Sequence, residues 1–225
     1  QNSTVDQLLL GVYDTLVQFT AGETSVSPRI ATDWSVSNDG MAYTFNLRKD
    51  ATFHDGSALT ADDVCFTYDR LNAAGANALN DAVNHESCQI VDDYTVTLHL
   101  SAPFGPFVSA LSRVYIVNKA LVEPHMGDNN ARTWLSVNEA GSGPYTVTTY
   151  KPTEEVVLTA YEPYWGGWDG NHVAEVVFRY IFEPSTQMAL LKSGEVHIAP
   201  DITVDDKVAL QGKSGYIVDV GAAAT

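Results

Sequence analysis

Residues Ala31 to Arg70 read ATDWSVSNDGMAYTFNLRKDATFHDGSALTADDVCFTYDR, and this stretch decides the fold. Within it, large apolar residues alternate with small or polar ones from Met41 to Arg48. Successive side chains of a strand point to opposite faces, so the alternation predicts a strand with one buried face. The preceding Asn38-Asp39-Gly40 is a tight-turn signal, because glycine tolerates positive φ and Asn or Asp can bond the turning backbone. The stretch therefore predicts a hairpin whose second strand is half buried.

A helix is expected after this hairpin. Thr60-Ala61-Asp62-Asp63 has the composition of a helix N-terminus. The threonine hydroxyl can accept a hydrogen bond from an otherwise unpaired amide, and the two carboxylates lie at the positive end of the helix dipole. Val64, Tyr68 and Leu71 follow at helical spacing, which gives the predicted helix an apolar face.

Further elements are expected downstream. Alternation predicts one amphipathic strand within residues 91–100, preceded by a loop through residue 86, and a hairpin made of residues 145–150 and 156–160. Residues 173–182 are predicted to form a largely buried strand. A helix begins at Pro184 and ends at Gly194.

The ordered motifs of residues 34–64 resemble the signature of the extracytoplasmic solute-binding proteins of peptide, dipeptide and nickel ABC importers. A glycine-rich turn ending in Gly-Pro-Tyr at 143–145, whose glycines permit close backbone approach, and an aromatic corner at 161–167 resemble the same family. The resemblance implies an α/β fold of the periplasmic-binding-protein-like type (class II, cluster C), with mixed β-sheet lobes flanked by helices. The first matching pieces are Trp34, the turn at 37–40, Tyr43-Thr44-Phe45, Leu47-Arg48, Phe53-His54-Asp55-Gly56 and Thr60-Ala61-Asp62-Asp63-Val64.

The resemblance also implies how the chain is divided. Residues 1–30 and 131–225 would form lobe I, discontinuous and incomplete, and residues 31–130 would form an inserted second lobe with a small sheet and helices. Residues 114–117 and 193–199 correspond to strands of the family. Members of the family are much longer than 225 residues, so the chain corresponds to an N-terminal half that lacks the C-terminal lobe. We expect that it folds alone but binds ligand weakly or not at all.

The candidate ligand contacts also come from the resemblance. Residues 13–16 match positions at the end of the first helix that line the ligand cleft in the family. Tyrosine offers an aromatic face and a hydroxyl, and Asp14 can pair with a ligand cation such as a peptide amino group. Asp201 leads into the cleft, and Arg113 can meet a ligand carboxylate, although an exposed arginine before a strand is the alternative. The predicted ligand-binding residues are Tyr13, Asp14, Thr15, Leu16, Asp201 and Arg113.

Composition limits the class of partner. The chain has 28 acidic and 12 basic residues and a net charge of -16. Proteins that bind nucleic acids or anionic membrane surfaces present cationic patches. We therefore expect no binding to nucleic acid or to an anionic membrane surface. The acidic surface suits a cationic ligand or serves solubility. No apolar run approaches the length of a membrane span, so no direct membrane insertion of this segment is expected. We expect an extracytoplasmic protein, in the periplasm or anchored as a lipoprotein at the outer face of the cytoplasmic membrane.

The two cysteines leave two alternatives open. Cys65 lies in the predicted helix and Cys88 just before the predicted strand. A disulfide between them would stabilise the fold by about 3 kcal/mol in the chain-entropy model, because it closes a loop in the unfolded chain. An even number of cysteines in an exported protein also favours a disulfide. Alternatively, both are buried thiols that pack as small apolar groups.

The search for catalytic and metal-binding motifs is negative. The histidines show no metal-ligand spacing such as His-Glu-x-x-His, and there is no nucleophile elbow. Adjacent carboxylates such as Asp62-Asp63 lie in caps or turns and do not face each other. The sequence therefore predicts neither an enzyme nor a cofactor.

The predicted function follows from the resemblance. It is that of the extracytoplasmic substrate-binding component of an ABC importer, which captures short peptides or a related small solute between its lobes and delivers them to the membrane permease. The main alternative is a sensory or protein-docking module that reuses the fold. Receptors for nickel chelates or oligosaccharides are further variants.

Overall fold

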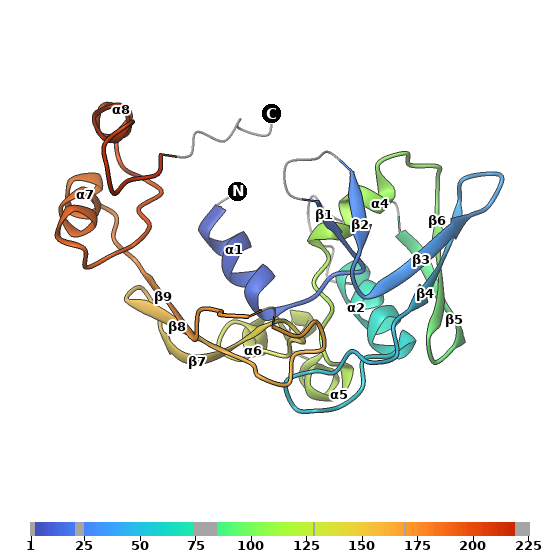
Figure 1. Ribbon diagram of the computed structural model, residues 1–225. Helices are drawn as coiled ribbons and strands as arrows, with labels where there is room; N and C mark the ends of the chain where they lie inside the picture. Colours follow the sequence, from blue (N-terminus) through green and yellow to red (C-terminus); the bar gives the residue numbers. More distant parts are fainter. Residues whose placement is uncertain (1–2, 21–24, 74–84, 128, 169, 219–225) are drawn as a thin grey trace. The chain divides into compact units, whose positions relative to one another are not determined.

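The computed structural model of the chain describes residues 3–20, 25–73, 85–127, 129–168 and 170–218 (Figure 1). The chain divides into two compact units, one of residues 1–151 and 156–177 and the other of residues 152–155 and 178–225. Within the described ranges, no helix combines the length and the apolar character that crossing a membrane requires.

The first unit contains a four-stranded antiparallel sheet (Figure 1). The predicted hairpin is confirmed, with Trp34 paired to Phe45 across its two strands. In the second of these strands Tyr43, Phe45 and Leu47 are buried, as the alternation predicts. In sheet order, the strands are β3 (Ala31–Val36), β4 (Ala42–Leu47), β6 (Thr95–Leu100) and β5 (His85–Asp92).

Helix α2 (Ala61–Ala73) packs against β5 and β6 and closes the core of this sheet. Val64 and Tyr68 are buried in that core, which confirms the predicted apolar face. The cap differs in one detail from the prediction. The Thr60 hydroxyl and backbone N–H both donate to Asp63 Oδ2 at 3.0 Å, so the threonine donates to the carboxylate, where the sequence suggested that it accepts from an amide.

Strand β5 is an edge strand that the sequence does not predict. Of its side chains only His85 is buried, so the strand lacks the alternation that would reveal it. Backbone hydrogen bonds to β6 hold one edge of this strand. A disulfide between Cys88 of β5 and Cys65 of α2, with a Cα separation of 5.2 Å, also joins the strand to the helix. Of the two alternatives for the cysteines, the structure has the bridge.

The N-terminal part of the first unit consists of α1 (Ser3–Val12) and the two-stranded pair of β1 (Val17–Phe19) and β2 (Val26–Pro28). The expected strand at residues 114–117 is absent. There the Ile116 N–H donates to the carbonyl of Asp14 and the Val117 N–H to the Thr67 hydroxyl, so these amides are satisfied outside any sheet. Short helices surround this segment: α4 (Phe107–Ala110), η1 (Leu111–Arg113), α5 (Lys119–Val122), η2 (Glu123–His125), η3 (Asn129–Ala131) and α6 (Arg132–Leu135).

A three-stranded sheet follows, in the order β7 (Tyr145–Lys151), β8 (Glu155–Ala160) and β9 (Glu175–Arg179). The predicted hairpin of β7 and β8 is confirmed. The prediction of a largely buried strand over residues 173–182 is wrong. Only five residues form the strand, and Val177 is 42% and Phe182 82% exposed. An apolar run at a sheet edge has the same pattern as a buried strand, so the sequence alone does not separate them.

The second unit contains α7 (Pro184–Ser193) and α8 (Val204–Leu210) around a small core of Met188, Ile202 and Leu210. Gly194 caps the C-terminus of α7 with a left-handed φ of 79°, as predicted for a helix stop. The expected strand at 193–199 is absent. The Glu195 and Val196 amides instead bond back to the Leu190 carbonyl, so the turn that ends the helix uses them.

Candidate functional site

The turn after α1 carries Asp14 into the interior of the first unit. The Asp14 side chain is 0% exposed, and Arg29 Nε donates to its Oδ1 at 2.6 Å. Trp165 Nε1 donates to Oδ2 at 2.7 Å, and the Ser142 hydroxyl donates to the same oxygen at 3.0 Å. Both carboxylate oxygens are therefore occupied by protein donors. In this structure Asp14 ties the end of α1 to segments more than a hundred residues away in sequence.

The aromatic corner extends this network. The hydroxyl of Tyr164 accepts from Arg29 Nη2 at 3.1 Å. Burial, and then the negative charge of Asp14, raise the pKa of Tyr164, so this hydroxyl stays neutral. The Arg48 guanidinium lies 3.6 Å from the centroid of the Trp165 ring, a cation–π contact. The corner therefore contributes to the charge network as well as to packing.

The other three residues of the α1 turn are also buried. Tyr13 is 7% exposed, its hydroxyl accepts from the Ala140 N–H at 3.4 Å, and burial raises its pKa to about 12. The Thr15 hydroxyl donates to a backbone carbonyl two residues further on, at 2.7 Å. Leu16 is part of the hydrophobic core. Residues 13–16 thus form one buried turn.

Arg113 and Asp201 lie on different units. Arg113 is the exposed last residue of η1, two residues before Tyr115, whose ring approaches that of Tyr13 at 6.2 Å. Asp201 is exposed in the second unit, and its N–H donates to the Gln187 side chain at 3.3 Å. The meeting of Asp201 with the residues of the first unit stays a prediction.

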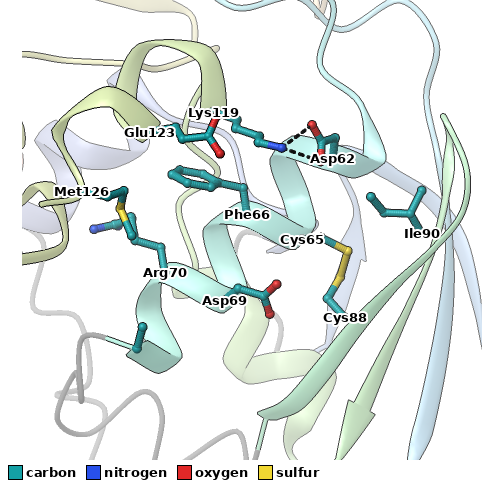
Figure 2. A pocket seen from close by; sticks show the side chains of 11 residues that line it. Asp62, Cys65, Phe66, Asp69, Arg70, Cys88, Ile90, Lys119, Glu123 and Met126 are labelled. Atoms are coloured by element: carbon teal, nitrogen blue, oxygen red, sulfur yellow. Dashed lines mark hydrogen bonds and ion pairs between the residues drawn. A yellow bond between two sulfur atoms is a disulfide. The ribbon is translucent and has the colours of Figure 1, made fainter.

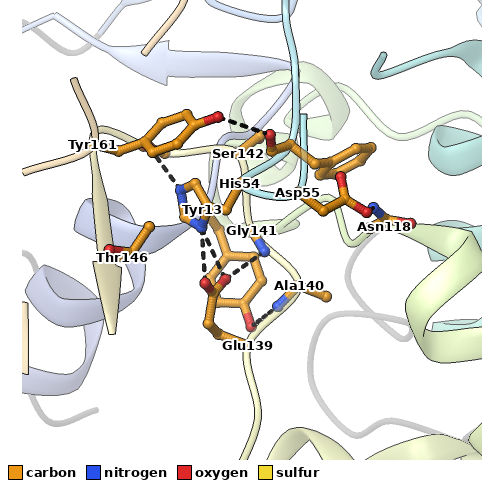
Figure 3. A network of polar contacts seen from close by, with 12 residues as sticks. Tyr13, His54, Asp55, Asn118, Glu139, Ala140, Gly141, Ser142, Thr146 and Tyr161 are labelled. Carbon is orange, nitrogen blue, oxygen red and sulfur yellow. Dashed lines mark hydrogen bonds and ion pairs between the residues drawn. The ribbon is translucent and has the colours of Figure 1, made fainter. Parts of the chain in front are cut away.

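A glycine-rich turn, residues 139–143, meets both the end of α1 and the segment around His54 (Figure 3). His54 Nδ1 lies 2.9 Å from Glu139 Oε1, and His54 Nε2 lies 2.9 Å from the Gly143 carbonyl oxygen. The Gly143 N–H donates to the Val12 carbonyl at 2.9 Å. Both segments stand out in the sequence as motifs, but no local rule links residues 85 positions apart, so the sequence does not predict their contact.

Close approach explains why the turn is rich in glycine. A Cβ on Gly141 would lie 2.0 Å from the Val12 carbonyl oxygen, and one on Gly143 would lie 2.6 Å from the Val12 carbonyl carbon. Real Cβ atoms do not approach backbone atoms so closely, so any side chain here would push the turn away from α1. The close backbone approach expected of these glycines is confirmed.

A separate open pocket of about 510 Å³ lies between α2, β5 and the α5–η2 segment (Figure 2). The disulfide forms part of its wall, and Lys119 Nζ donates to Asp62 Oδ2 at 2.8 Å beside it. None of the sequence-predicted ligand contacts lines it. Within the described residues, no group of three or more His, Cys, Asp or Glu side chains is placed to hold a metal ion. The lining residues are Asp62, Cys65, Phe66, Asp69, Arg70, Ala73, Cys88, Ile90, Lys119, Glu123 and Met126.

Comparisons with known proteins agree with the resemblance. The probable D,D-dipeptide-binding periplasmic protein DdpA of Escherichia coli is 31% identical, over 88% of this chain and 39% of its own length. Two solved structures are each 29% identical over 83% of this chain. The Helicobacter pylori periplasmic binding protein DppA in complex with the peptide STSA has a TM-score of 0.71, with 40% of its chain covered. NikZ of Campylobacter jejuni in complex with Ni(L-His) has a TM-score of 0.74, with 37% covered.

These matches confirm the periplasmic-binding-protein-like α/β fold. The chain spans about two fifths of the length of these relatives, as expected for an N-terminal half. The family model described as "Bacterial extracellular solute-binding proteins, family 5 Middle" matches residues 25–224. This match covers most of the chain and includes the hairpin, the α2 cap, the glycine-rich turn and the aromatic corner. The chain therefore belongs to the bacterial extracellular solute-binding proteins of family 5.

Proposed function

We propose that this chain is part of the extracytoplasmic substrate-binding component of an ABC importer that captures short peptides and delivers them to the membrane permease. The observation that carries the proposal is the family match over residues 25–224, together with a relative named for dipeptide binding at 31% identity. Residues 1–30 with 131–225 and residues 31–130 would act as two lobes that close over the ligand.

The residues proposed to meet the ligand are Tyr13, Asp14, Thr15, Leu16, Arg113 and Asp201. Two of these carry exposed charges, Arg113 in the first unit and Asp201 in the second. Their charges are of the kind that pair with the carboxylate and the amino group of a peptide. The buried α1 turn would act mainly as the fixed wall of the cleft, because its polar groups already bond within the protein.

We further propose that the protein works outside the cytoplasmic membrane, in the periplasm or anchored there as a lipoprotein, and catalyses no reaction. Relatives named as periplasmic binding proteins support this location. Capture by lobe closure needs no chemistry from the protein, so an enzymatic role is not required.

A nickel-chelate receptor is the second candidate, because one solved relative holds Ni(L-His). Binding of a chelate needs no metal-ligand cluster in the protein when the small molecule supplies the ligands. An oligosaccharide receptor and a sensory or protein-docking module are weaker alternatives, and none of the reported relatives favours them.

The test is native mass spectrometry and calorimetry on two proteins, this chain and the same chain extended to the length of its relatives. The ligand panel contains di- to tetrapeptides, nickel with L-histidine, and an oligosaccharide. We expect short peptides to bind the long form and to bind this chain weakly or not at all. Exclusive binding of nickel–histidine would favour the second candidate, and a defined complex of the short chain with a protein partner would favour the docking module.

Two variants of the long form refine the test. Arg113→Gln and Asp201→Asn are expected to weaken peptide binding, because each removes one charge that would face a charged end of the peptide. The matched controls are Arg132→Gln and Asp205→Asn, which remove the same charges at other exposed positions of the same unit. Equal effects of variants and controls would refute the proposed contacts.

A further inference from the structure

Five exposed carboxylates lie along the interface between helix α2 and strand β5 with its following turn, residues 61–73 and 85–93. The Ala61 N–H donates to the Asp93 carbonyl at 2.8 Å, so the turn meets the start of the helix directly. At the other end of the strand, His85 Nε2 lies 3.4 Å from Asp69 Oδ1. The interface therefore gathers like charges from two segments of the chain. The five residues are Asp62, Asp69, Glu86, Asp92 and Asp93.

Positive charge next to these carboxylates is sparse in the described part of the chain. Lys119 Nζ donates to Asp62 Oδ2 at 2.8 Å, and Lys49 Nζ lies 5.5 Å from the centroid of the tyrosine ring after the turn. Arg70 of α2 instead donates to a backbone carbonyl of η3, from Nη1 at 3.2 Å. Burial lowers the pKa of His85, so its ring is neutral at neutral pH and does not offset the carboxylate beside it. The interface keeps an excess of negative charge, in a chain whose net charge is -16.

Like charges in this number matter when the ionic strength is low. Two unit charges about 10 Å apart in water repel enough to change an equilibrium constant about twofold, and the carboxylates of the interface form several such pairs. The Debye length is about 30 Å at 0.01 M salt and about 3 Å at 1 M. The repulsion therefore opposes the interface in dilute salt and is screened in concentrated salt.

Few side-chain contacts hold β5 against this repulsion. Of its side chains only His85 is buried, in contact with a tyrosine ring of α2 at 5.5 Å between centroids, and one edge of the strand pairs with β6. The Cys65–Cys88 disulfide ties the two elements covalently (Figure 2). Cys65 lies about one turn from each of Asp62 and Asp69 on the same face of the helix. The disulfide thus crosses the interface among the carboxylates.

We propose that the disulfide offsets the repulsion between the carboxylates of α2 and β5. With the bridge, the interface stays closed at any ionic strength. Without it, β5 stays on α2 in concentrated salt and opens in dilute salt. In the proposed extracytoplasmic location the surroundings set the ionic strength, and the bridge would make the first unit independent of it. Only this last consequence rests on the proposed function.

This role differs from the usual effect of a cross-link. In the chain-entropy model a disulfide acts on the unfolded chain through the length of the loop that it closes, which salt does not change. An electrostatic role makes the contribution of the bridge larger in dilute salt than in concentrated salt. The dependence on salt therefore separates the two effects.

The first experiment compares the bridged protein with the Cys65→Ala/Cys88→Ala variant by hydrogen exchange, in about 0.01 M and about 1 M KCl. We expect the amides of β5 in the variant to be at least about tenfold less protected in the dilute salt, since several pairs each contribute about twofold. In the bridged protein the change should be about twofold or less. Amides of β4, an inner strand of the same sheet, report general effects of salt on the fold. If salt changes β5 protection equally in both proteins, the proposal is overturned.

Two charge variants in the unbridged background locate the repulsion. Glu86→Gln/Asp93→Asn removes two carboxylates of the interface and should restore β5 protection in dilute salt. Asp6→Asn/Glu175→Gln removes the same charge from α1 and β9 of the same unit and should leave that protection low. Equal recovery in both would assign the effect to the net charge of the unit and refute the role of the interface.

A second measurement keeps the cysteines. Dithiothreitol, an uncharged dithiol, reduces the protein disulfide to two thiols and is itself oxidised to a cyclic disulfide. The equilibrium constant for forming the protein disulfide in this exchange should rise from dilute to concentrated KCl, because the carboxylates drive the two thiols apart in dilute salt. The rise should be smaller in Glu86→Gln/Asp93→Asn than in Asp6→Asn/Glu175→Gln. A constant that does not change with salt would contradict the proposal, whether or not the reduced chain stays folded.

Discussion

Replacing Asp14 by alanine should destabilise the first unit strongly. The carboxylate is 0% exposed and its partner Arg29 is 18% exposed, so Asp14→Ala leaves a largely buried guanidinium without its counter-charge. Breaking a buried ion pair from one side costs about 3–5 kcal/mol. The Trp165 and Ser142 donors lose their acceptor as well, at about 1–3 kcal/mol for each group that water cannot reach. Because Arg29 keeps some contact with solvent, we expect a total loss near 3–5 kcal/mol.

The assay is urea unfolding followed by tryptophan fluorescence and circular dichroism. The control is Asp50→Ala, which breaks the Arg48–Asp50 pair at the surface, where Asp50 is 64% exposed. An exposed pair contributes about 1 kcal/mol or less. The double variant Asp14→Ala/Arg29→Ala should lose less than the sum of the two single variants, because it removes the stranded charge. If Asp14→Ala unfolds like the Asp50→Ala control, the buried carboxylate does not hold this network together and the reasoning is wrong.

Three further outcomes are expected. Gly143→Ala should lose at least about 1–3 kcal/mol of unfolding free energy, because the new Cβ meets backbone of α1, whereas Gly105→Ala, with nothing within 4 Å, should change it by about 0.5 kcal/mol or less. Replacing Cys65 and Cys88 together by alanine should cost about 3 kcal/mol for the lost loop constraint; a loss below about 1 kcal/mol in the same urea assay would contradict this. Partial burial opposes ionisation of Asp55, but hydrogen bonds, led by those from Ser57, lower its pKa. The stability that the ionised carboxylate contributes is therefore complete above the unfolded-state value of about 4 and is lost at lower pH, as the pH falls through the lowered pKa. The stability gap between the unaltered protein and Asp55→Asn should therefore close in acid.

Elements that are buried on one side were predictable from the sequence. Strand β4 shows strict alternation and α2 begins at a recognisable cap, so both were found close to their observed bounds. Strand β5 was missed because its exposed side chains leave no periodic pattern. The apolar run around Val177 led to the opposite error, the prediction of a buried strand where the structure has a partly exposed one. Apolar residues at the edge of a sheet have the same sequence pattern as a buried strand. Burial is a property of the assembled fold, and the sequence reveals it only where the buried side chains recur at the regular spacing of a strand or a helix.

The site was predictable only in part. The family resemblance pointed to the α1 turn as a candidate site. Its burial in a polar network depends on partners such as Arg29 and Trp165, which lie 15 and 151 positions from Asp14 in the sequence. The contact between His54 and Glu139 spans 85 positions. Such pairs are set by how segments fold back on one another, and no local rule of spacing reports them. The motifs showed which segments matter, and the structure shows which of them touch.

The bridge between α2 and β5 also makes the chain tolerant of a break. The two half-cystines are separated by 23 positions, so a protease that cuts once anywhere between them produces two fragments that remain covalently attached. Under oxidising conditions the nicked protein migrates as a single species, and the cut becomes visible only after a reductant is added. A lesion in this interval would therefore change the covalent connectivity of the backbone while leaving β5 anchored to its helix.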